Sequence, residues 1–410
     1  MPNLSRPRPV LLVVLLAFVS LVGYALRTNI SVAQEYMVPE LGLSFKDMGI
    51  ISFWGFQFAY AVFQIPAGFL GDRFGSRIVL TLALIGWALG SFASGLVPAA
   101  AGTAFISLFA ARALLGVAQA ATYPVGAMAI AQTVPLGSQA TANAVFISAA
   151  LLGSGFAPLT LAPLMVAAGW RTVFLASGVL GLLTAALWFV LAPVPRKGPT
   201  TAPSIGAQLR ASIAFLGHRD IMLVSTSYLM LSAVWFVFVF WFFRYLVDGR
   251  GFSILASGVW GSAPYFISVA ISPFGGVLAD RLARRFSAGR SRRVVAMAGL
   301  LIGALLVAVG ANLANPYIAI IALSLAVSCI NACEGPFWAT VTAFGRSNPG
   351  AAGGVLNFMG NVGGISILVV PYMKDALGWT AMLGFWAAVA VVAALLWLVV
   401  RVDRQELPNA

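Results

Sequence analysis

Charged residues are scarce in this chain. Only 9% of its 410 residues are Asp, Glu, Lys or Arg, whereas 61% are hydrophobic and the mean hydropathy is +0.97. A soluble globular domain carries about a quarter charged residues, so these few charges cannot cover a water-exposed surface of this size. The shortage excludes a soluble protein and indicates a chain embedded in lipid.

Residues that build catalytic and metal sites are also few. The two cysteines, Cys329 and Cys333, lie four apart in an apolar stretch, and the single histidine is His218. We interpret the cysteines as reduced packing residues, because a metal pair would lack further ligands. No phosphate-binding glycine loop with lysine and no nucleophile elbow occurs. The sequence thus predicts no enzyme, no cofactor, no metal site and no ATP-driven transport.

Long apolar runs dominate instead. A membrane helix needs about 20 mostly apolar residues, and the run after Arg6 and Arg8 continues too far for a cleaved signal peptide. The sequence predicts an all-α membrane protein with twelve transmembrane helices in two pseudo-symmetric six-helix bundles. The bundles are residues 1–193 and 219–410, joined by a cytoplasmic linker loop at 194–218. The expected spans are 10–33, 48–70, 78–97, 103–129, 138–165, 170–193, 219–246, 255–279, 294–313, 316–342, 350–373 and 380–400.

The net charge of +13 would suggest nucleic acid in a soluble protein. In a membrane protein, however, lysine and arginine gather on the cytoplasmic side. With both termini cytoplasmic, seventeen of the 24 basic residues fall on that side and four on the other. The distribution therefore predicts a multi-pass inner (plasma) membrane protein with both termini in the cytoplasm and no nucleic-acid partner.

The two halves share a pattern after their second spans. Gly68-Phe-Leu-Gly-Asp72-Arg73 continues to Arg77 in the first half, and Gly276-Val-Leu-Ala-Asp280-Arg281 opens a basic loop in the second. An acid followed by arginines at a helix end can latch helix termini together. The matching positions indicate a duplicated carrier architecture. The expected latch residues are Asp72, Arg73, Arg77, Asp280 and Arg281.

The segment from Gly68 to Arg77 resembles the signature loop of the major facilitator superfamily. Further segments resemble its anion:cation symporter branch of organic-acid and sugar-acid carriers. These are residues 27–31, 63–66, 112–116, 169–171, 250–253, 336–338 and 360–364. The resemblance implies that Arg27 and Arg112 meet the substrate carboxylate. Leu26 and Gln119 stand where members commonly carry an aspartate and a glutamate linked to proton coupling.

Physical chemistry points to the same two arginines. A guanidinium inside a span costs roughly 2.5–3.5 kcal/mol on insertion scales and cannot lose its proton. The acids of the first half, such as Glu35 and Glu40, lie near span ends or in loops, so we expect an anionic substrate as the counter-ion. The guanidinium fork matches a carboxylate. The alternative is that Arg27 and Arg112 cap backbone carbonyls or reach an interface.

Glu334 is the one carboxylate deep in the second half, at about the depth of Gln119. Burial raises the pKa of a carboxyl group in general, which makes Glu334 the candidate for proton coupling. Two alternatives remain open. Glu334 forms an ion pair with an arginine that locks a gate, or it is a structural acid bonded within its own helix.

Arg244 and Asp248 are spaced i, i+4, which predicts a salt bridge at the end of the seventh span. An outer gate or a substrate contact is the alternative. Polar and aromatic side chains that could line a cavity are also candidates, although helix packing explains each equally well. They are Tyr24, Asn29, Tyr60, Gln64, Gln119, Tyr123, Tyr228, Trp235, Trp338, Asn357 and Asn361.

Together these observations predict a monomeric secondary carrier of a small organic anion, a carboxylate or sugar acid, that works by alternating access and is coupled to protons. Facilitated uniport and anion exchange are alternatives, because both acids linked to coupling are missing. A membrane sensor for the same ligand is a third hypothesis, for which a soluble output domain would be expected.

Overall fold

The computed structural model describes residues 9–135, 138–193, 205–345 and 348–402. These residues form helices and no strand, and the segments η1 and η3 have the wider turns of a π-helix. The elements of the first part of the chain are α1 (Pro9–Leu41), α2 (Phe45–Ile50), η1 (Ile51–Phe58), α3 (Ala59–Phe74), α4 (Ser76–Gly95), α5 (Ala101–Gln119), α6 (Thr122–Thr133), α7 (Gln139–Ala168) and α8 (Trp170–Leu191). Those of the second part are α9 (Ile205–Leu216), α10 (Arg219–Arg244), η3 (Tyr245–Gly249), α11 (Ile254–Gly261), α12 (Ala263–Ala283), α13 (Ala288–Asn312), α14 (Pro316–Asn331), α15 (Glu334–Phe344), α16 (Pro349–Val362) and α17 (Ile365–Val399).

Eleven helical segments of the described chain are long and apolar enough to cross a membrane. The last of them, Gly350–Val399, has 50 residues. At about 1.5 Å per residue it would be more than twice the roughly 30 Å of a hydrocarbon core. Gly378 breaks this segment with φ 76° and ψ 169°, between the expected spans 350–373 and 380–400. The all-α fold with twelve predicted spans is therefore confirmed.

The chain divides into two compact units. The first comprises Met1–Ala202 together with Phe252–Ser262, and the second comprises Pro203–Gly251 together with Ala263–Ala410. Helix α11, which precedes α12 within the expected eighth span, thus packs with the first unit, on α7. Within the expected linker 194–218, residues 205–216 form α9, which packs on α16. Residues 194–204 lie outside the described chain.

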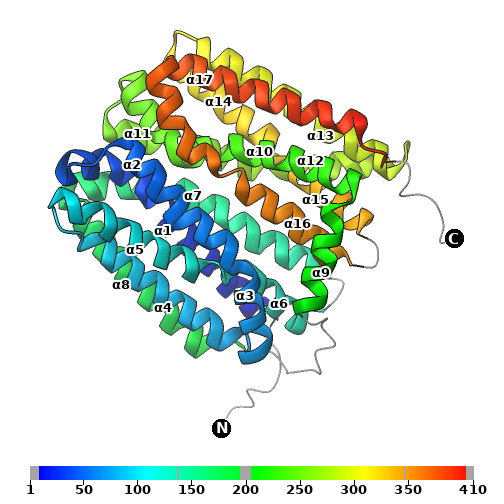
Figure 1. Cartoon of the computed structure of the whole chain (residues 1–410), viewed down its shortest axis with the longest axis horizontal. Coiled ribbons are helices and arrows are strands. Elements are labelled where there is room, and N and C mark those ends of the chain that lie inside the picture. Colours follow the sequence, from blue (N-terminus) through cyan, green and yellow to red (C-terminus); the bar gives the residue numbers. More distant parts are fainter. Residues whose placement is uncertain (1–8, 136–137, 194–204, 346–347, 403–410) are drawn as a thin grey trace. The chain divides into compact units, whose positions relative to one another are not determined.

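In the first unit, α1 runs beside α7 and α4 beside α8 (Figure 1). Trp87 of α4 and Trp188 of α8 are almost fully buried among leucine and valine side chains of α1 and α4. In the second unit, α10 packs on α16 and α17. A Cβ atom on Gly363 would lie 2.4 Å from the carbonyl oxygen of Leu229. The close approach of α16 to α10 therefore depends on glycine at position 363.

The fourth and tenth spans are both broken near their middles. Helix α5 ends at Gln119 and α6 begins at Thr122, while α14 ends at Asn331 and α15 begins at Glu334. In each case a proline, Pro124 or Pro336, is the third residue of the second half-helix. Gln119 thus corresponds to Asn331, and Glu334 corresponds to Thr122, three residues beyond Gln119.

The halves also match where the last helix of each begins. Gly169 precedes Trp170 with φ 79°, and Gly378 precedes Trp379 with φ 76°. The indole Nε1 of Trp170 donates to Glu40 Oε2 over 2.6 Å, and that of Trp379 donates to Asp248 Oδ2 over 2.7 Å. Glu40 lies in the last turn of α1 and Asp248 in η3, so the duplication extends from the sequence to side-chain contacts.

Candidate functional site

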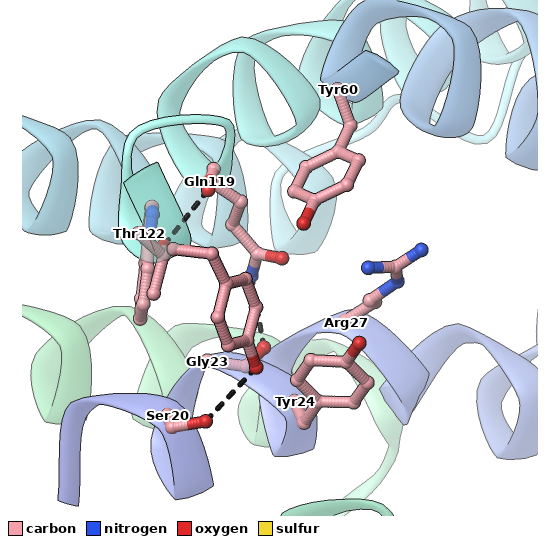
Figure 2. A pocket seen from close by; sticks show the side chains of 9 residues that line it. Ser20, Gly23, Tyr24, Arg27, Tyr60, Gln119 and Thr122 are labelled. Atoms are coloured by element: carbon pink, nitrogen blue, oxygen red, sulfur yellow. Dashed lines mark hydrogen bonds between the residues drawn. The ribbon is translucent and has the colours of Figure 1, made fainter. Parts of the chain in front are cut away.

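A small pocket lies in the first unit at the break between α5 and α6. Helix α1 forms one wall, and α3, α4 and the two half-helices form the others (Figure 2). Broken helices are the usual place for substrate sites in carriers. The lining residues are Ser20, Gly23, Tyr24, Arg27, Tyr60, Trp87, Gln119, Thr122 and Tyr123.

Arg27 places a cation in the wall of this pocket. Its guanidinium carbon lies 5.2, 4.9 and 4.8 Å from the ring centroids of Tyr24, Phe56 and Tyr60. Its Nη2 donates a hydrogen bond to Oε1 of Gln57. Aromatic faces attract a cation, and they do so more strongly when water is excluded. The three rings and the amide stabilise the charge of Arg27 without supplying an opposite charge.

Arg112 lies behind Arg27 and does not line the pocket. Its side chain is fully buried, with Nη2 donating to the backbone oxygen of Arg27 over 3.0 Å and Nη1 reaching Asn29 Oδ1 over 3.4 Å. Its guanidinium carbon lies 5.2 Å from the ring of Phe56, which Arg27 also contacts. Arg112 therefore holds the backbone of α1 at Arg27, and the side chain of Asn29 accepts its second hydrogen bond.

Hydroxyl and amide groups make up most of the remaining pocket wall. Gln119 donates from Nε2 to the carbonyl of Gly23 over 2.9 Å, and Thr122 donates back to the Gln119 carbonyl over 2.8 Å. The hydroxyls of Ser20 and Tyr123 lie 3.0 Å apart. Figure 2 shows the amide oxygen of Gln119 facing the space in front of Arg27. The wall is thus rich in neutral hydrogen-bonding groups.

Phe56 and Gln57 were not expected from the sequence. Both lie in η1, where the π-helical turns change the direction of side chains, and both are fully buried. A Cβ atom on Gly116 of α5 would lie 2.4 Å from the carbonyl oxygen of Phe56, so η1 and α5 approach closely. Helical segments with π-type turns occur frequently at functional sites, but no apolar period marks this segment.

The second unit carries an acid where the first carries Thr122. The hydroxyl of Tyr228 donates to both oxygens of Glu334, over 3.1 and 2.9 Å, and Trp338 Nε1 donates to Oε2 over 3.2 Å. Trp338 is one turn further along α15, so part of this bonding lies within the same helix. Glu334 also occupies the first turn of α15, where the helix dipole favours negative charge.

Other residues expected near a cavity are distributed over both units. Gln64 follows Tyr60 by one turn in α3, and the two side chains interact. Asn361 donates from its amide to the backbone oxygen of Asn357 over 2.8 Å within α16. Trp235 packs edge-on against Tyr265 in the second unit. Of the residues expected to line a cavity, the pocket brings together Tyr24, Arg27, Tyr60, Gln119 and Tyr123.

The expected latch residues lie at helix ends. Arg77 donates through Nε to the carbonyl of Phe189 near the end of α8 over 2.7 Å. In the second unit Arg293 donates to the carbonyl of Val400, after α17. An arginine thus caps the carboxyl end of the last helix in each unit. The helix dipole favours a cation at this end. Asp72, Arg73, Asp280 and Arg281 are exposed.

The ion pair expected from the i, i+4 spacing is present. Arg244 Nη2 lies 3.0 Å from Asp248 Oδ1, and Lys374 Nζ lies 3.1 Å from Oδ2. With the indole of Trp379, three donors converge on this one carboxylate. The cluster joins η3 to α17 within the second unit.

The chain is similar to known transport proteins over most of its length. A family model described as the Major Facilitator Superfamily matches residues 14–369. The chain is 28% identical to a D-galactonate transporter of Escherichia coli O6:H1, and 31% identical to the probable galactarate/D-glucarate transporter GarP of Escherichia coli K12. Both alignments cover 97% of this chain and 96% of the relative.

A solved bacterial homologue of the human lysosomal transporter Spinster has the same fold. Its TM-score is 0.79 at 17% identity, with 99% of this chain and all of that chain covered. The expected family resemblance is therefore confirmed over nearly the whole sequence. The chain is a multi-pass membrane transporter, not an enzyme, and it belongs to the major facilitator superfamily.

Proposed function

We propose that this chain carries a small organic acid across the inner membrane by alternating access, with Arg27 as the carboxylate ligand. The observation that carries the proposal is the guanidinium of Arg27, which three aromatic rings and the Gln57 amide hold in the wall of a hydroxyl-rich pocket. Two oxygens of a carboxylate match two N–H groups of one guanidinium. The relatives named for galactonate, galactarate and glucarate transport support this substrate class.

The repeated architecture supports alternating access. The two units carry equivalent helix breaks and equivalent capping arginines, as expected for halves that rock against each other. The basic residues support cytoplasmic termini, with residues 1–193 and 219–410 as the two bundles. A monomer suffices for this mechanism, since one chain contains both halves.

The first test is counterflow of radiolabelled D-galactonate into proteoliposomes that contain the purified chain. Wild type should exchange the acid and not a neutral hexose. Arg27→Gln should abolish exchange, and Arg27→Lys should retain a fraction, because it keeps the charge and loses the fork. Arg210→Gln, at an exposed position on α9, is the matched control and should leave exchange unchanged. Full exchange by Arg27→Gln would refute the proposed carboxylate ligand.

Glu334 is the proposed proton-coupling group. It is the acid at the break of the tenth span, and Tyr228 and Trp338 donate to it. Hydrogen bonds from these two donors stabilise the ionised carboxylate. Because both donors are neutral, no fixed positive charge lies among them to hold Glu334 in its ionised form. Protonation then changes the net charge of the second unit by one.

The coupling test compares two modes of the same proteoliposomes. In Glu334→Gln, accumulation driven by a pH gradient should be lost while counterflow exchange persists, because exchange needs no net proton movement. Undiminished gradient-driven accumulation would eliminate Glu334 as the coupling acid. It would then favour the alternatives of uniport or anion exchange, which need no titrating group.

A further inference from the structure

The structure also bears on how many carboxylates the ligand carries, a question that rests on the proposed function. The relatives leave it open, since one is named for a monoacid, galactonate, and another for the diacids galactarate and glucarate. A diacid that binds in a low-dielectric site needs a cation or several donors for each of its carboxylates. The number of guanidiniums that a ligand can reach therefore limits the charge of the ligand.

Arg112 is occupied by the protein itself. Its side chain has no exposed surface, its two terminal nitrogens are directed to the Arg27 backbone and to Asn29, and one face lies against Phe56. Its Nε is buried and has no hydrogen-bond partner among the described residues. A carboxylate could reach this guanidinium only by displacing Phe56 or the backbone of α1. We therefore interpret Arg112 as a positioning residue for Arg27.

The surroundings of Arg27 leave space for at most one carboxylate. The rings of Tyr24, Phe56 and Tyr60 lie around its guanidinium, Nη2 is engaged by Gln57, and the side chain of Tyr60 is hydrogen-bonded to Arg27. The ligand must therefore approach along an edge of the guanidinium plane, where a single carboxylate fits. In Figure 2 the hydroxyls of Tyr24 and Tyr60 lie on the same side of the pocket as this guanidinium.

Beyond Arg27, the pocket wall is neutral. Gln119, Thr122 and Tyr123 carry amide and hydroxyl groups, and Trp87 and Gly23 are further uncharged parts of the wall. Hydroxyl groups of a ligand can exchange their water for these partners without loss. A second carboxylate would lose its hydration and find no cation in exchange. The donors of Gln119 and Thr122 are already directed to backbone carbonyls, so burying the second carboxylate is costly.

The described residues of the second unit, taken by itself, add no further cation at the middle of a span. Within its described residues, Arg244 pairs with Asp248, and Arg250 donates to Tyr245 and to the carbonyls that end α13. The ionisable group at its helix break is an acid, Glu334. Each unit separately thus argues against a second anionic group on the ligand.

We infer that the ligand is a hydroxylated acid with a single carboxylate, an aldonate type of molecule, and that the matching dicarboxylates are rejected. Arg27 binds the one carboxylate, and the hydroxyl and amide groups around Gln119 bind the neutral part of the ligand. Arg112 acts on the ligand only through the position of Arg27.

The test is a direct binding titration of the purified full-length chain by calorimetry. The probes form matched pairs that differ in one terminal group, galactonate with galactarate and gluconate with glucarate, with galactitol as the uncharged member. The monoacid of a pair should bind at least about tenfold more tightly than its diacid, which is about 1.4 kcal/mol. Equal or tighter binding of the diacids would overturn the inference and leave the proposed carboxylate carrier intact. Binding of galactitol alone, or of none of the acids, would overturn both.

A second arm tests the role of Arg112 in the same titration. If Arg112 only positions Arg27, Arg112→Lys weakens both members of each pair by the same factor and leaves their ratio unchanged. A selective loss of diacid binding would place Arg112 on a second carboxylate and would refute the inference. The wild-type pair measurement stands alone if this variant does not fold.

Discussion

The two broken spans of this protein have the same geometry and opposite electrostatics. In both, a half-helix ends, two residues intervene, and a second half-helix begins that has a proline as its third residue. The first break faces the cation Arg27 and begins its second half-helix with Thr122. The second break begins its half-helix with Glu334. Duplication thus supplied one scaffold twice, and single residues determine the charge at each break: Thr122 is neutral and faces the cation Arg27 of α1, whereas Glu334 is an acid.

This difference suggests a division of labour between the units. Gln119 in the first break donates to a backbone carbonyl and has no ionisable group. The side chains that line its pocket include no carboxyl and no imidazole group among the described residues. We propose that the first unit binds the anion and that the second unit carries the proton. The predictions below move or remove charge at these two breaks, from the largest expected effect to the smallest.

Giving the first break the acid of the second should have the largest effect. In Thr122→Glu a carboxylate lines the same pocket as Arg27, pairs with its guanidinium and repels the ligand. Acid binding should weaken at least about tenfold, since a buried like charge or a lost partner costs about 2 kcal/mol or more. Calorimetry with galactonate measures the change. The control is Thr122→Gln, whose side chain has the size of glutamate but no charge, and it should bind galactonate within about threefold of wild type. Equal losses in both variants would indicate a steric effect and not the charge.

Removing one donor at the second break should have an intermediate effect. Tyr228→Phe leaves Glu334 with its indole donor only, and a hydrogen bond to a charged group contributes about 1.5–3 kcal/mol. Gradient-driven uptake in proteoliposomes should fall several-fold while counterflow remains near the wild-type rate. Tyr265→Phe is the control, since in the same unit it removes a hydroxyl that donates to the backbone carbonyl of Phe238. A parallel loss in both modes would show that Tyr228 serves folding and not coupling.

The smallest effect is expected where the halves are alike. Trp170→Phe and Trp379→Phe each remove one indole hydrogen bond to a partly exposed carboxylate, which is worth about 1 kcal/mol. Each should lower the thermal unfolding temperature in detergent slightly and by a similar amount. Exchange should persist in both. A large drop for only one of them would show that the two ends are not equivalent.

The sequence predicts the architecture well, for physical reasons that act locally. Apolar runs of span length, the asymmetry of basic residues and the repeated glycine–acid–arginine segment each follow from the lipid environment. The i, i+4 spacing of Arg244 and Asp248 is likewise local, and the pair is present. The helix breaks were not predicted, since the runs 103–129 and 316–342 each have the length and hydropathy of one continuous span, although Pro124 and Pro336 mark the breaks in retrospect.

The candidate site was predicted only in part. Depth within a span identifies Arg27 and Arg112 as notable, but it cannot tell which guanidinium faces a pocket, because that depends on helix rotation and packing. Gln57 and Phe56, which contact Arg27, lie in a π-helical segment that has no sequence period of its own. The contact between Trp170 and Glu40 joins residues 130 apart in sequence, a distance over which no local pattern acts.

The most direct test of the division of labour is thermal stabilisation by galactonate of three purified proteins: wild type, Arg27→Gln and Glu334→Gln. A ligand at about 100 times its Kd stabilises the folded state by about 2.7 kcal/mol. Our account predicts that wild type and Glu334→Gln are stabilised alike and that Arg27→Gln is not stabilised at any concentration. Stabilisation of Arg27→Gln, or its loss in Glu334→Gln, would contradict the claim that the first unit alone binds the anion.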